Sequence, residues 1–465
     1  MKSSIPSPAS WLCAALLVTA CGGSGASRPE PGTTNVLLVV VDTLGAKHLG
    51  SYGGDAHWRP AASPRLDQLA RESVRFERAY SSAPWTQPSV ASLMTSRMPS
   101  RHRVQNLLDS LPEDERTLAE ALSEGGYATH AVISHHLINQ EFGFQQGFTE
   151  TFDTDGVRGH DGITSEIVTD RAMEVLDGAG EDPFFLFVHY FDPHFLYHHH
   201  EDYDRTSGYG GNLRPAMPVW QLRDVRELLT PLDLEYVVGL YQEEVAYTDH
   251  HIGRLLDHLA ATGLEDDTLV VFTADHGEEF MEHGWIGHTR NLYDDLIRVP
   301  LLVRLPGRIA PAVVAEPVST IDVAPTVLDL VLGSPFGPQA EGRALTATLL
   351  DGTTPERRAL HAEVSFAPVT GDPARTKQKE AFMTAIVYGD QKLVHDLSTD
   401  EWLHFRHGDD PGEDQNVYDA GAESSQALRA RLEAWEASHR PRSAGSGDGI
   451  SEEELARLRD LGYVR

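Results

Sequence analysis

Three apolar runs, each followed by polar residues, constrain the fold more than any other feature of this sequence. They are NVLLVVV (Asn35–Val41), PFFLFVHY (Pro183–Tyr190) and TLVVFTA (Thr268–Ala274). Continuous apolar, β-branched runs of this length predict strands buried on both faces. Helical periodicity fills the chain between them, most clearly from Leu234 to Leu259. The sequence therefore predicts an α/β fold with a largely parallel sheet and helices on both of its faces.

Two further regions complete the predicted fold. Arg298–Arg304 (RVPLLVR) predicts another strand, and Pro300 places it near an edge of the sheet or makes its pairing irregular. From about Leu360 the pattern weakens into short strands, an acidic loop and a helix from Ser424 to Ser438. We therefore expect a main domain over 35–359 and a smaller C-terminal α+β subdomain with a helical tail over 360–465.

The first 34 residues predict export and anchoring. The apolar stretch Trp11–Ala20 is too short to span a bilayer and fits a secretory signal. It ends in VTACGG, which resembles the lipobox of bacterial lipoproteins and implies cleavage before Cys21 with lipidation of its sulfur. An ordinary signal peptide is the alternative. We expect a lipoprotein signal peptide over 1–20, a flexible Gly/Ser-rich tether over 21–34, and a membrane-anchored protein in the cell envelope, outside the cytoplasmic membrane.

Cysteine usage and charge narrow the chemistry. Cys13 would leave with the signal, and Cys21 would be acylated, so no thiol would remain for a disulfide, a nucleophile or a metal ligand. The formal net charge of −32 at pH 7 argues against nucleic-acid binding. An anionic substrate stays compatible with this charge, because one metal ion inverts the local field of a site.

Acidic and imidazole side chains follow all three of the buried runs. Asp42 follows the first, Asp192 and His194 follow the second, and Asp275 and His276 follow the third. In open parallel sheets, ligands bind outside the carboxyl ends of the strands. A single aspartate there often caps a helix, but three such strand ends together predict a functional site.

A threonine completes this candidate site. In the segment APWTQPSVASLMT, Thr86 stands just before an apparent helix start, with Pro88 at an early helical position. A hydroxyl there lies at the positive end of the helix dipole, which stabilises an anion. Taken alone, Thr86 could be a plain N-cap; beside the three strand ends we interpret it as a nucleophile.

Several segments together resemble the sulfatase family of the alkaline phosphatase superfamily, from about Asn35 to Asn416. They are NVLLVVVDTLGAKHLGSYGG, SPRLDQLA, APWTQPSVASLMTSRMPSRH, FFLFVHYFDPH, VFTADHGEEFMEHG, LYDDLIRVPLLVRLPG and STIDVAPTVLDL. The resemblance implies an alkaline phosphatase-like fold and one divalent metal ion bound by Asp42, Thr86, Asp275 and His276. It also implies that His194 and His288 contact the ester anion or protonate the leaving group.

The implied mechanism is covalent. The metal lowers the pKa of the Thr86 hydroxyl, and the alkoxide attacks phosphorus or sulfur in line. The resulting Thr86 ester is then released by water or by a second alcohol.

Departures from the family pattern bear on the substrate. Sulfatases carry Cys-x-Pro-x-Arg, whose Cys becomes formylglycine, whereas this chain has Thr86 and, in place of the arginine, Val90. Thr43 replaces the second of the paired aspartates, and His276 replaces an asparagine. This ligand set favours Zn²⁺ or Mn²⁺ over Ca²⁺, with Mg²⁺ also open. It resembles the superfamily's phosphodiesterases and its phosphoethanolamine or glycerophosphate transferases.

The sequence thus predicts a metal-dependent hydrolase of sulfate or phosphate esters, with phosphate esters favoured. Two alternatives remain: an envelope phosphotransferase, and a glycan-binding pseudoenzyme. The expected partners are an anionic ester, such as an envelope glycan or a lipid headgroup, and the membrane through the lipid anchor.

Other polar residues receive weaker expectations. His135-His136 lies where the family often has a catalytic Lys or His, and His283 is expected to form hydrogen bonds beside the site. Solvent-exposed positions are expected for Lys47, His198–His200, His250-His251 and Asp409–Asp414. Metal binding by the two histidine runs and contact of Lys47 with an anionic substrate are the alternatives.

Overall fold

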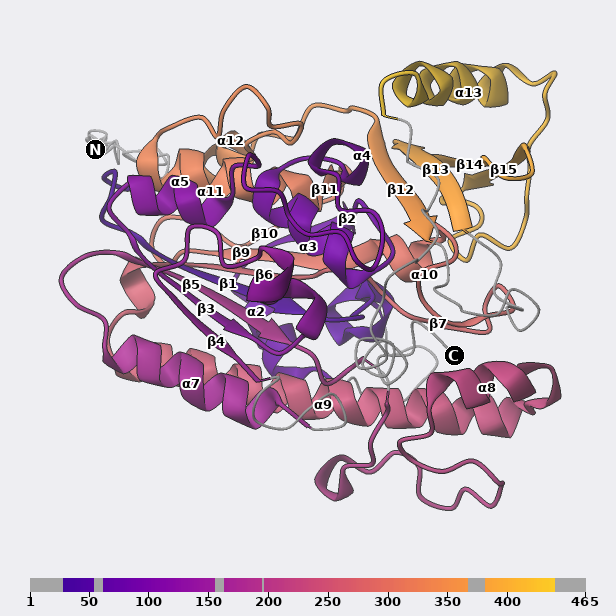
Figure 1. Cartoon of the computed structure of the whole chain (residues 1–465), viewed down its shortest axis with the longest axis horizontal. Coiled ribbons are helices and arrows are strands. Elements are labelled where there is room, and N and C mark those ends of the chain that lie inside the picture. The colour runs from indigo at the N-terminus through magenta and orange to yellow at the C-terminus, as the bar shows by residue number, and fades with distance from the viewer. Residues whose placement is uncertain (1–27, 54–61, 155–162, 195, 367–380, 440–465) are drawn as a thin grey trace, which may run out of the picture.

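The computed structural model describes residues 28–53, 62–154, 163–194, 196–366 and 381–439 (Figure 1). The predicted signal peptide, Cys21 and the end of the helical tail lie outside these ranges. Within the described part, no helix is both long and apolar enough to cross a membrane.

A nine-stranded sheet forms the centre of the molecule, in the order β10-β2-β9-β6-β1-β5-β3-β4, with β11 also beside β2. All of its pairs are parallel except those that β9 makes with β2 and β6. The strands are β1 (Asn35–Val41), β2 (Val74–Tyr80), β3 (Ala128–Ile133), β4 (Glu150–Asp153), β5 (Phe184–Tyr190), β6 (Thr268–Ala274), β9 (Arg298–Arg304), β10 (Ala312–Val314) and β11 (Val318–Ser319).

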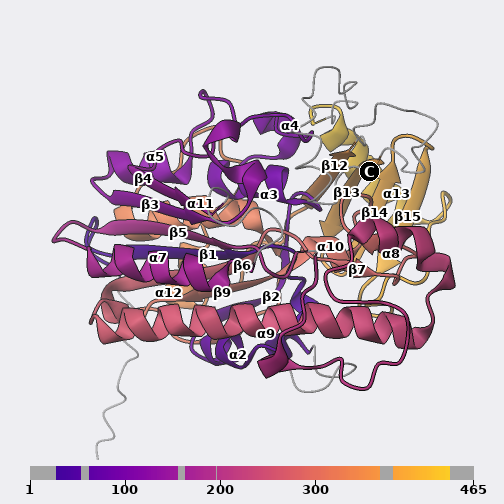
Figure 2. The ribbon, with the colours of Figure 1, turned by 60° about the horizontal axis from the view of Figure 1, so that its bottom comes forward.

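Helices cover both faces of this sheet (Figures 1 and 2). One layer contains α2 (Pro64–Arg71), α7 (Ser165–Asp177) and the long α9 (Pro231–Ala261), against whose end α8 (Val219–Val225) lies. The other contains α3 (Thr86–Thr95), α4 (Pro99–His102), α5 (Leu118–Glu124), α11 (Val323–Leu332) and α12 (Thr346–Asp351). Because β1, β5 and β6 are buried along their whole length between these layers, continuous apolar runs are what such strands require. The predicted α/β class is confirmed.

The strand β9 resolves the two readings of Pro300. It lies inside the sheet, between β2 and β6, so the predicted edge position is wrong. Its pairing with β2 is irregular: the register shifts between Phe76 and Ala79, where Pro300 has no partner. A proline has no N–H to give to the ladder, and the bulge opposite it removes the need for one. On the other side, the carbonyl oxygen of Pro300 accepts a hydrogen bond from the Thr273 hydroxyl (2.8 Å).

A smaller antiparallel sheet follows in the chain and lies beside the main domain (Figure 1). Its strands are β12 (Leu360–Phe366), β13 (Ala381–Tyr388), β14 (Gln391–Asp396) and β15 (Glu401–Arg406), and α13 (Glu423–Glu436) packs on it. The strand β12 joins this sheet to the start of α3, since Glu363 N donates to Ser82 O (2.9 Å) and the Trp85 ring meets Phe366 edge-on. The exact division into domains stays a prediction.

A buried lysine links the two sheets electrostatically. Lys392 on β14 is fully buried and lies 2.9 Å from Asp294 Oδ1, on α10 (Asp294–Ile297), and 2.8 Å from Glu413 Oε1. Although burial opposes it, these two carboxylates raise the pKa of Lys392. Glu413 also pairs with His407 (2.8 Å). The expectation that the whole acidic loop is solvated is therefore wrong at Glu413, which is buried and neutralises this cation.

Lys392→Met is expected to lower the free energy of unfolding by about 3–5 kcal/mol, because it leaves two buried carboxylates without their cation. Urea titration followed by fluorescence measures this loss. Arg429→Met serves as the control: Arg429 pairs with Glu433 at 2.7 Å on the surface of α13, so its loss should cost about 1 kcal/mol or less. Equal effects of the two substitutions would contradict the role assigned to Lys392.

Candidate functional site

Two aspartates come together at the carboxyl edge of the central sheet. The register pairs Val41 of β1 with both Tyr190 of β5 and Ala274 of β6, so the residues that follow these strands start from the same level. Asp42 N donates to Tyr190 O (2.8 Å), and Asp275 Oδ1 accepts hydrogen bonds from Thr43 N (3.2 Å) and His276 N (2.7 Å). Both carboxylates are buried.

Thr86 reaches the same place from the other side. It is the first residue of α3, one position further into the helix than predicted; the N-cap is Trp85, and no side chain caps this helix end. The Thr86 hydroxyl lies 3.4 Å from Asp42 Oδ2 and 3.3 Å from His276 Nε2. The hydroxyl therefore faces the acidic cluster, which is inconsistent with a plain N-cap.

His276 turns one ring nitrogen toward both aspartates. Its Nδ1 lies 2.9 Å from Gly277 O, so Nδ1 carries the proton and donates it to that carbonyl. Its Nε2 lies 3.5 Å from both Asp42 Oδ1 and Asp275 Oδ2. Burial, and then the neighbouring His288, hold the pKa of His276 well below its usual value, which keeps the ring neutral.

His189 is a site residue that sequence reasoning missed. It lies within β5, and its Nε2 is 3.7 Å from Asp42 Oδ2. Asp42, His189 and Asp275 each offer a ligand atom within 4.8 Å of the others. The sequence feature that could have identified His189 is its position as an imidazole inside the otherwise apolar run FFLFVHY.

The donor set fits a divalent cation. Asp42 Oδ1 and Asp275 Oδ2 are buried and have no hydrogen-bond partner within the described structure. Burial, and then Asp275, raise the pKa of Asp42 well above its usual range, and burial raises the pKa of Asp275 to about 8. Two buried acids that face each other and neutral imidazoles are stable when a cation lies between them. Mixed oxygen and nitrogen ligands are those that Zn²⁺ and Mn²⁺ accept.

A second group of residues lies against the first. His288 Nδ1 is 3.0 Å from Glu278 Oε1, and the Tyr197 hydroxyl donates to Glu278 Oε2 (3.0 Å). The His288 ring centre is 4.5 Å from that of His276 and 5.0 Å from that of His194. Glu278 was also missed by the sequence analysis. It fixes the orientation of His288, and burial raises its own pKa to about 8.

Of the two polar residues that follow β5, His194 lies at the site and Asp192 does not. Asp192 Oδ1 accepts from Thr164 N and its hydroxyl (both 2.7 Å), and Oδ2 accepts from Ser165 N (2.8 Å). Asp192 therefore stabilises the start of α7 and does not face Asp42. His194 does lie at the site, where its ring stacks on Phe191.

The remaining histidines differ in their burial and in whether they lie near Asp42. His135 is buried with its Nε2 3.8 Å from Asp42 Oδ2, whereas the adjacent His136 packs against Phe142. His200 is buried and lies 2.7 Å from Glu244, and His251 is also buried. The expected solvent exposure is therefore wrong for these last two residues.

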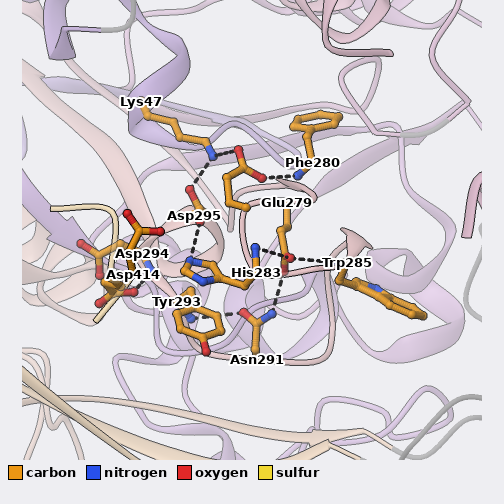
Figure 3. A network of polar contacts seen from close by, with 12 residues as sticks. Lys47, Glu279, Phe280, His283, Trp285, Asn291, Tyr293, Asp294, Asp295 and Asp414 are labelled. Atoms are coloured by element: carbon orange, nitrogen blue, oxygen red, sulfur yellow. Dashed lines mark hydrogen bonds and ion pairs between the residues drawn. The ribbon is translucent and has the colours of Figure 1, made fainter. Parts of the chain in front are cut away.

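A polar network supports the segment that carries His288 (Figure 3). Glu279 accepts hydrogen bonds from His283 N (3.0 Å), Trp285 N (2.8 Å) and Asn291 Nδ2 (2.7 Å). His283 Nε2 lies 3.2 Å from Asp295 Oδ2, and Lys47 pairs with Asp295 and Glu282. Lys47 thus anchors this segment and is only partly exposed, in contrast to the expected solvent-facing position.

Comparison with known proteins identifies the family. The sulfatase family model matches residues 34–334, and the model of the C-terminal region of N-sulphoglucosamine sulphohydrolase matches residues 281–438. Human N-sulphoglucosamine sulphohydrolase is 30% identical over 85% of this chain and 78% of its own length. The choline-sulfatase of Rhizobium meliloti is 28% identical over 73% of this chain and 76% of its own length.

Solved structures agree with the fold. A structure in complex with its substrate D-glucosamine-2-N,6-O-disulfate has a TM-score of 0.71 at 22% identity, covering 87% of this chain and 98% of that one. The phosphonate monoester hydrolase of Agrobacterium radiobacter also has a TM-score of 0.71, at 23% identity, covering 87% of this chain and 96% of that one. The predicted alkaline phosphatase-like fold is confirmed. This chain belongs to the sulfatase family of ester hydrolases, whose members generally bind a divalent metal ion.

Proposed function

We propose that this member of the sulfatase family hydrolyses phosphate esters in preference to sulfate esters, with Thr86 as nucleophile. The observation that carries the proposal is the position of the Thr86 hydroxyl, buried between Asp42 (3.4 Å) and His276 (3.3 Å) at the first residue of α3. A hydroxyl held there is ordered before substrate arrives, and the N-terminal dipole of α3 favours its alkoxide.

The proposed cation would be held by Asp42, Asp275, His276 and Thr86, with His189 as a further candidate ligand. When bound, it would compensate the two carboxylates and lower the pKa of the Thr86 hydroxyl. Zn²⁺ or Mn²⁺ is proposed on the mixed donor set.

The remaining residues have roles that follow from their contacts. Thr86 Oγ1, once its proton has passed to solvent, attacks phosphorus and forms the Thr86 O–P bond while the bond to the leaving alcohol breaks. His288 gives its Nε2 proton to that alcohol oxygen while its Nδ1 takes a proton from Glu278, 3.0 Å away, whose pKa of about 8 keeps that carboxyl protonated at neutral pH. His194, whose ring centre lies 5.0 Å from that of His288, contacts the ester anion. Water then attacks phosphorus and returns a proton to His288; the Thr86 O–P bond breaks, phosphate is released and Thr86 takes its proton back from solvent.

The preference for phosphorus follows from the chemistry of threonine. A formylglycine hydrate expels sulfate by collapsing to its aldehyde, and a threonine ester has no such route. A threonine phosphoester needs only a second attack at phosphorus. The phosphonate monoester hydrolase among the structural relatives supports the view that this fold accommodates phosphorus esters.

The test compares matched 4-nitrophenyl phosphate, bis(4-nitrophenyl) phosphate and 4-nitrophenyl sulfate on the purified protein loaded with Zn²⁺ or Mn²⁺. We expect kcat/KM for one of the phosphate esters to exceed that for the sulfate by at least about tenfold, or about 1.4 kcal/mol of transition-state stabilisation. Efficient cleavage of the sulfate alone would refute the preference. Product formed only with an added alcohol would indicate the phosphotransferase, and no turnover of any ester would indicate the pseudoenzyme.

We also propose that the protein is anchored in the cell envelope through Cys21. Cells expressing the full chain should incorporate labelled palmitate into it, and Cys21→Ser should abolish the label because the thioether can no longer form. Cys13→Ser is the matched control and should stay labelled, since Cys13 lies in the segment that cleavage removes. Labelled Cys21→Ser protein would refute the anchor.

A further inference from the structure

Three arginines surround a single indole next to the candidate site. The guanidinium carbon of Arg290 lies 3.9 Å from the centre of the Trp285 ring, that of Arg226 lies at 5.1 Å and that of Arg223 at 5.2 Å. Arg223 lies on α8, and Arg226 lies on the short 3-10 helix Arg226–Leu228. Arg290 lies in the segment after β8 (Ile286–Gly287), the strand that pairs with β7 (Glu279–Phe280). In Figure 3 the Trp285 indole points away from the Glu279 network. We call these three residues the arginine cluster.

Within the described residues, little compensates the charge of Arg290 and Arg226, whereas Arg223 interacts electrostatically with the buried Glu278. Arg290 Nη2 is buried without a hydrogen-bond partner, and Arg290 forms no ion pair with any residue that the structure describes. Arg226 is paired only loosely, at 3.4 Å, with the exposed Glu227. Burial, and then Arg223 and Arg226, lower the pKa of Arg290 to about 9. Contact with the face of the indole attracts each guanidinium but supplies no carboxylate partner.

The arginine cluster adjoins the catalytic groups. Arg223 Nε donates to Ile286 O (2.8 Å), and its Nη2 occupies the space beside Gly287, where an added Cβ would lie 2.2 Å away. The next residue is His288, whose pKa Arg223 helps to lower after burial. Thr289 N donates to Pro84 O (3.2 Å), which ties the same segment to the residues before Thr86. The contacts thus run from Thr86 through His276 and His288 to the arginine cluster.

We infer that the arginine cluster binds a second anionic group, carried by the alcohol part of the ester, and that the substrates of this enzyme are polyanionic esters. The inference rests on the proposed function in one respect: it takes His288 as the side on which the alcohol leaves. A guanidinium group binds sulfate, phosphate or carboxylate oxygens in pairs, and an anion there would supply the missing partner of Arg290. The chain as a whole has a net charge of −32. The arginine cluster therefore provides a local positive site on an acidic protein, and no described carboxylate lies beside Arg290.

Binding of sucrose octasulfate, a polyanion without an aromatic ring, tests the arginine cluster independently of catalysis. Calorimetry on the full soluble chain should show at least tenfold weaker binding for Arg290→Met than for the unmodified protein. Arg226→Met, at a position whose side chain is 30% exposed, should also weaken binding and covers the case in which Arg290→Met does not fold. The matched control is Arg429→Met, since Arg429 also lies over an indole, 4.6 Å from the Trp402 ring, but is paired with Glu433. Binding unchanged in the folded Arg290 and Arg226 variants would overturn the inference.

Kinetics then test the link to substrate. Two aryl phosphates are compared, identical except for a carboxylate on the leaving aryl group. The ratio of kcat/KM for the carboxylated ester to that for the plain ester should fall at least tenfold in Arg290→Met, mainly through KM. An unchanged ratio would overturn the substrate assignment. If no ester is hydrolysed while octasulfate binding still depends on Arg290, the proposed function fails and the anion-binding site stands.

Discussion

Thr86→Ala is expected to lower kcat for phosphate esters on the order of 10⁴-fold or more, because removing a nucleophile leaves only the rate due to binding and positioning. The structure makes this change specific: the lost oxygen is the one that lies 3.4 Å from Asp42 and 3.3 Å from His276. Because no side chain caps α3, the substitution removes no cap and should leave the helix in place. Single-turnover and steady-state rates at saturating substrate, with metal content measured in each sample, provide the readout.

Two controls separate chemistry from packing. Thr86→Ser keeps a hydroxyl at the start of α3 and should retain part of the activity. Thr95→Ala removes a buried hydroxyl from the other end of the same helix, where it only donates to Ala91 O (2.7 Å), and should keep kcat within a few-fold. If Thr86→Ala retained more than about a tenth of the activity with its metal bound, another group would have to be the nucleophile.

The central strands of the sheet could be predicted because they are unusually apolar. Strands buried on both faces are apolar at nearly every position, so the sequence predicts β1, β5 and β6 directly. Once they were placed in a parallel sheet, Asp42 and Asp275 had to meet at one edge, and the structure brings them there.

What the sequence could not provide was the direction of each side chain. Asp192 and Asp42 both follow buried strands, but Asp192 turns to the backbone of Thr164 and Ser165 and stabilises a helix instead. Capping and ligation use the same carboxylate, and the choice depends on which helix begins nearby in space. The position of β9 in the sheet could not be predicted from Pro300 for a related reason. An interior strand accepts a proline when its neighbour has a bulge opposite, and that bulge is seen only in the paired strands.

Long-range contacts account for the residues that were missed. The role of Glu278 becomes clear only when Tyr197, 81 residues earlier in the chain, and His288 are found beside its two carboxylate oxygens. His189 lay within a segment already assigned to the core, where an imidazole is most often a buried, satisfied group. Its proximity to Asp42, at 3.7 Å, follows from the pairing of β5 with β1.

Asp275→Asn is expected to abolish metal binding while leaving the fold intact. The amide oxygen can still accept the hydrogen bonds from Thr43 N and His276 N that Asp275 Oδ1 accepts now. What is lost is the charge on Oδ2, the oxygen that has no hydrogen-bond partner in the described structure and faces His276 Nε2 at 3.5 Å. Plasma mass spectrometry should find about one divalent ion per unmodified chain and close to none in the variant.

The loss of metal binding should also appear in thermal unfolding, as loss of the stabilisation that the metal gives the native state. Because a ligand at a hundred times its Kd stabilises the native state by about 2.7 kcal/mol, Zn²⁺ or Mn²⁺ should raise the Tm of the metal-stripped protein but not that of Asp275→Asn. Asp249→Asn is the matched control: Asp249 is also a buried carboxylate that accepts two backbone hydrogen bonds, from Arg65 N (3.0 Å) and Leu66 N (2.7 Å), but it lies in α9 away from the candidate ligands. That variant should be less stable overall and still gain Tm with metal. Stoichiometric metal in Asp275→Asn, or loss of the metal response in Asp249→Asn as well, would show that the cation is not bound where the two buried aspartates meet.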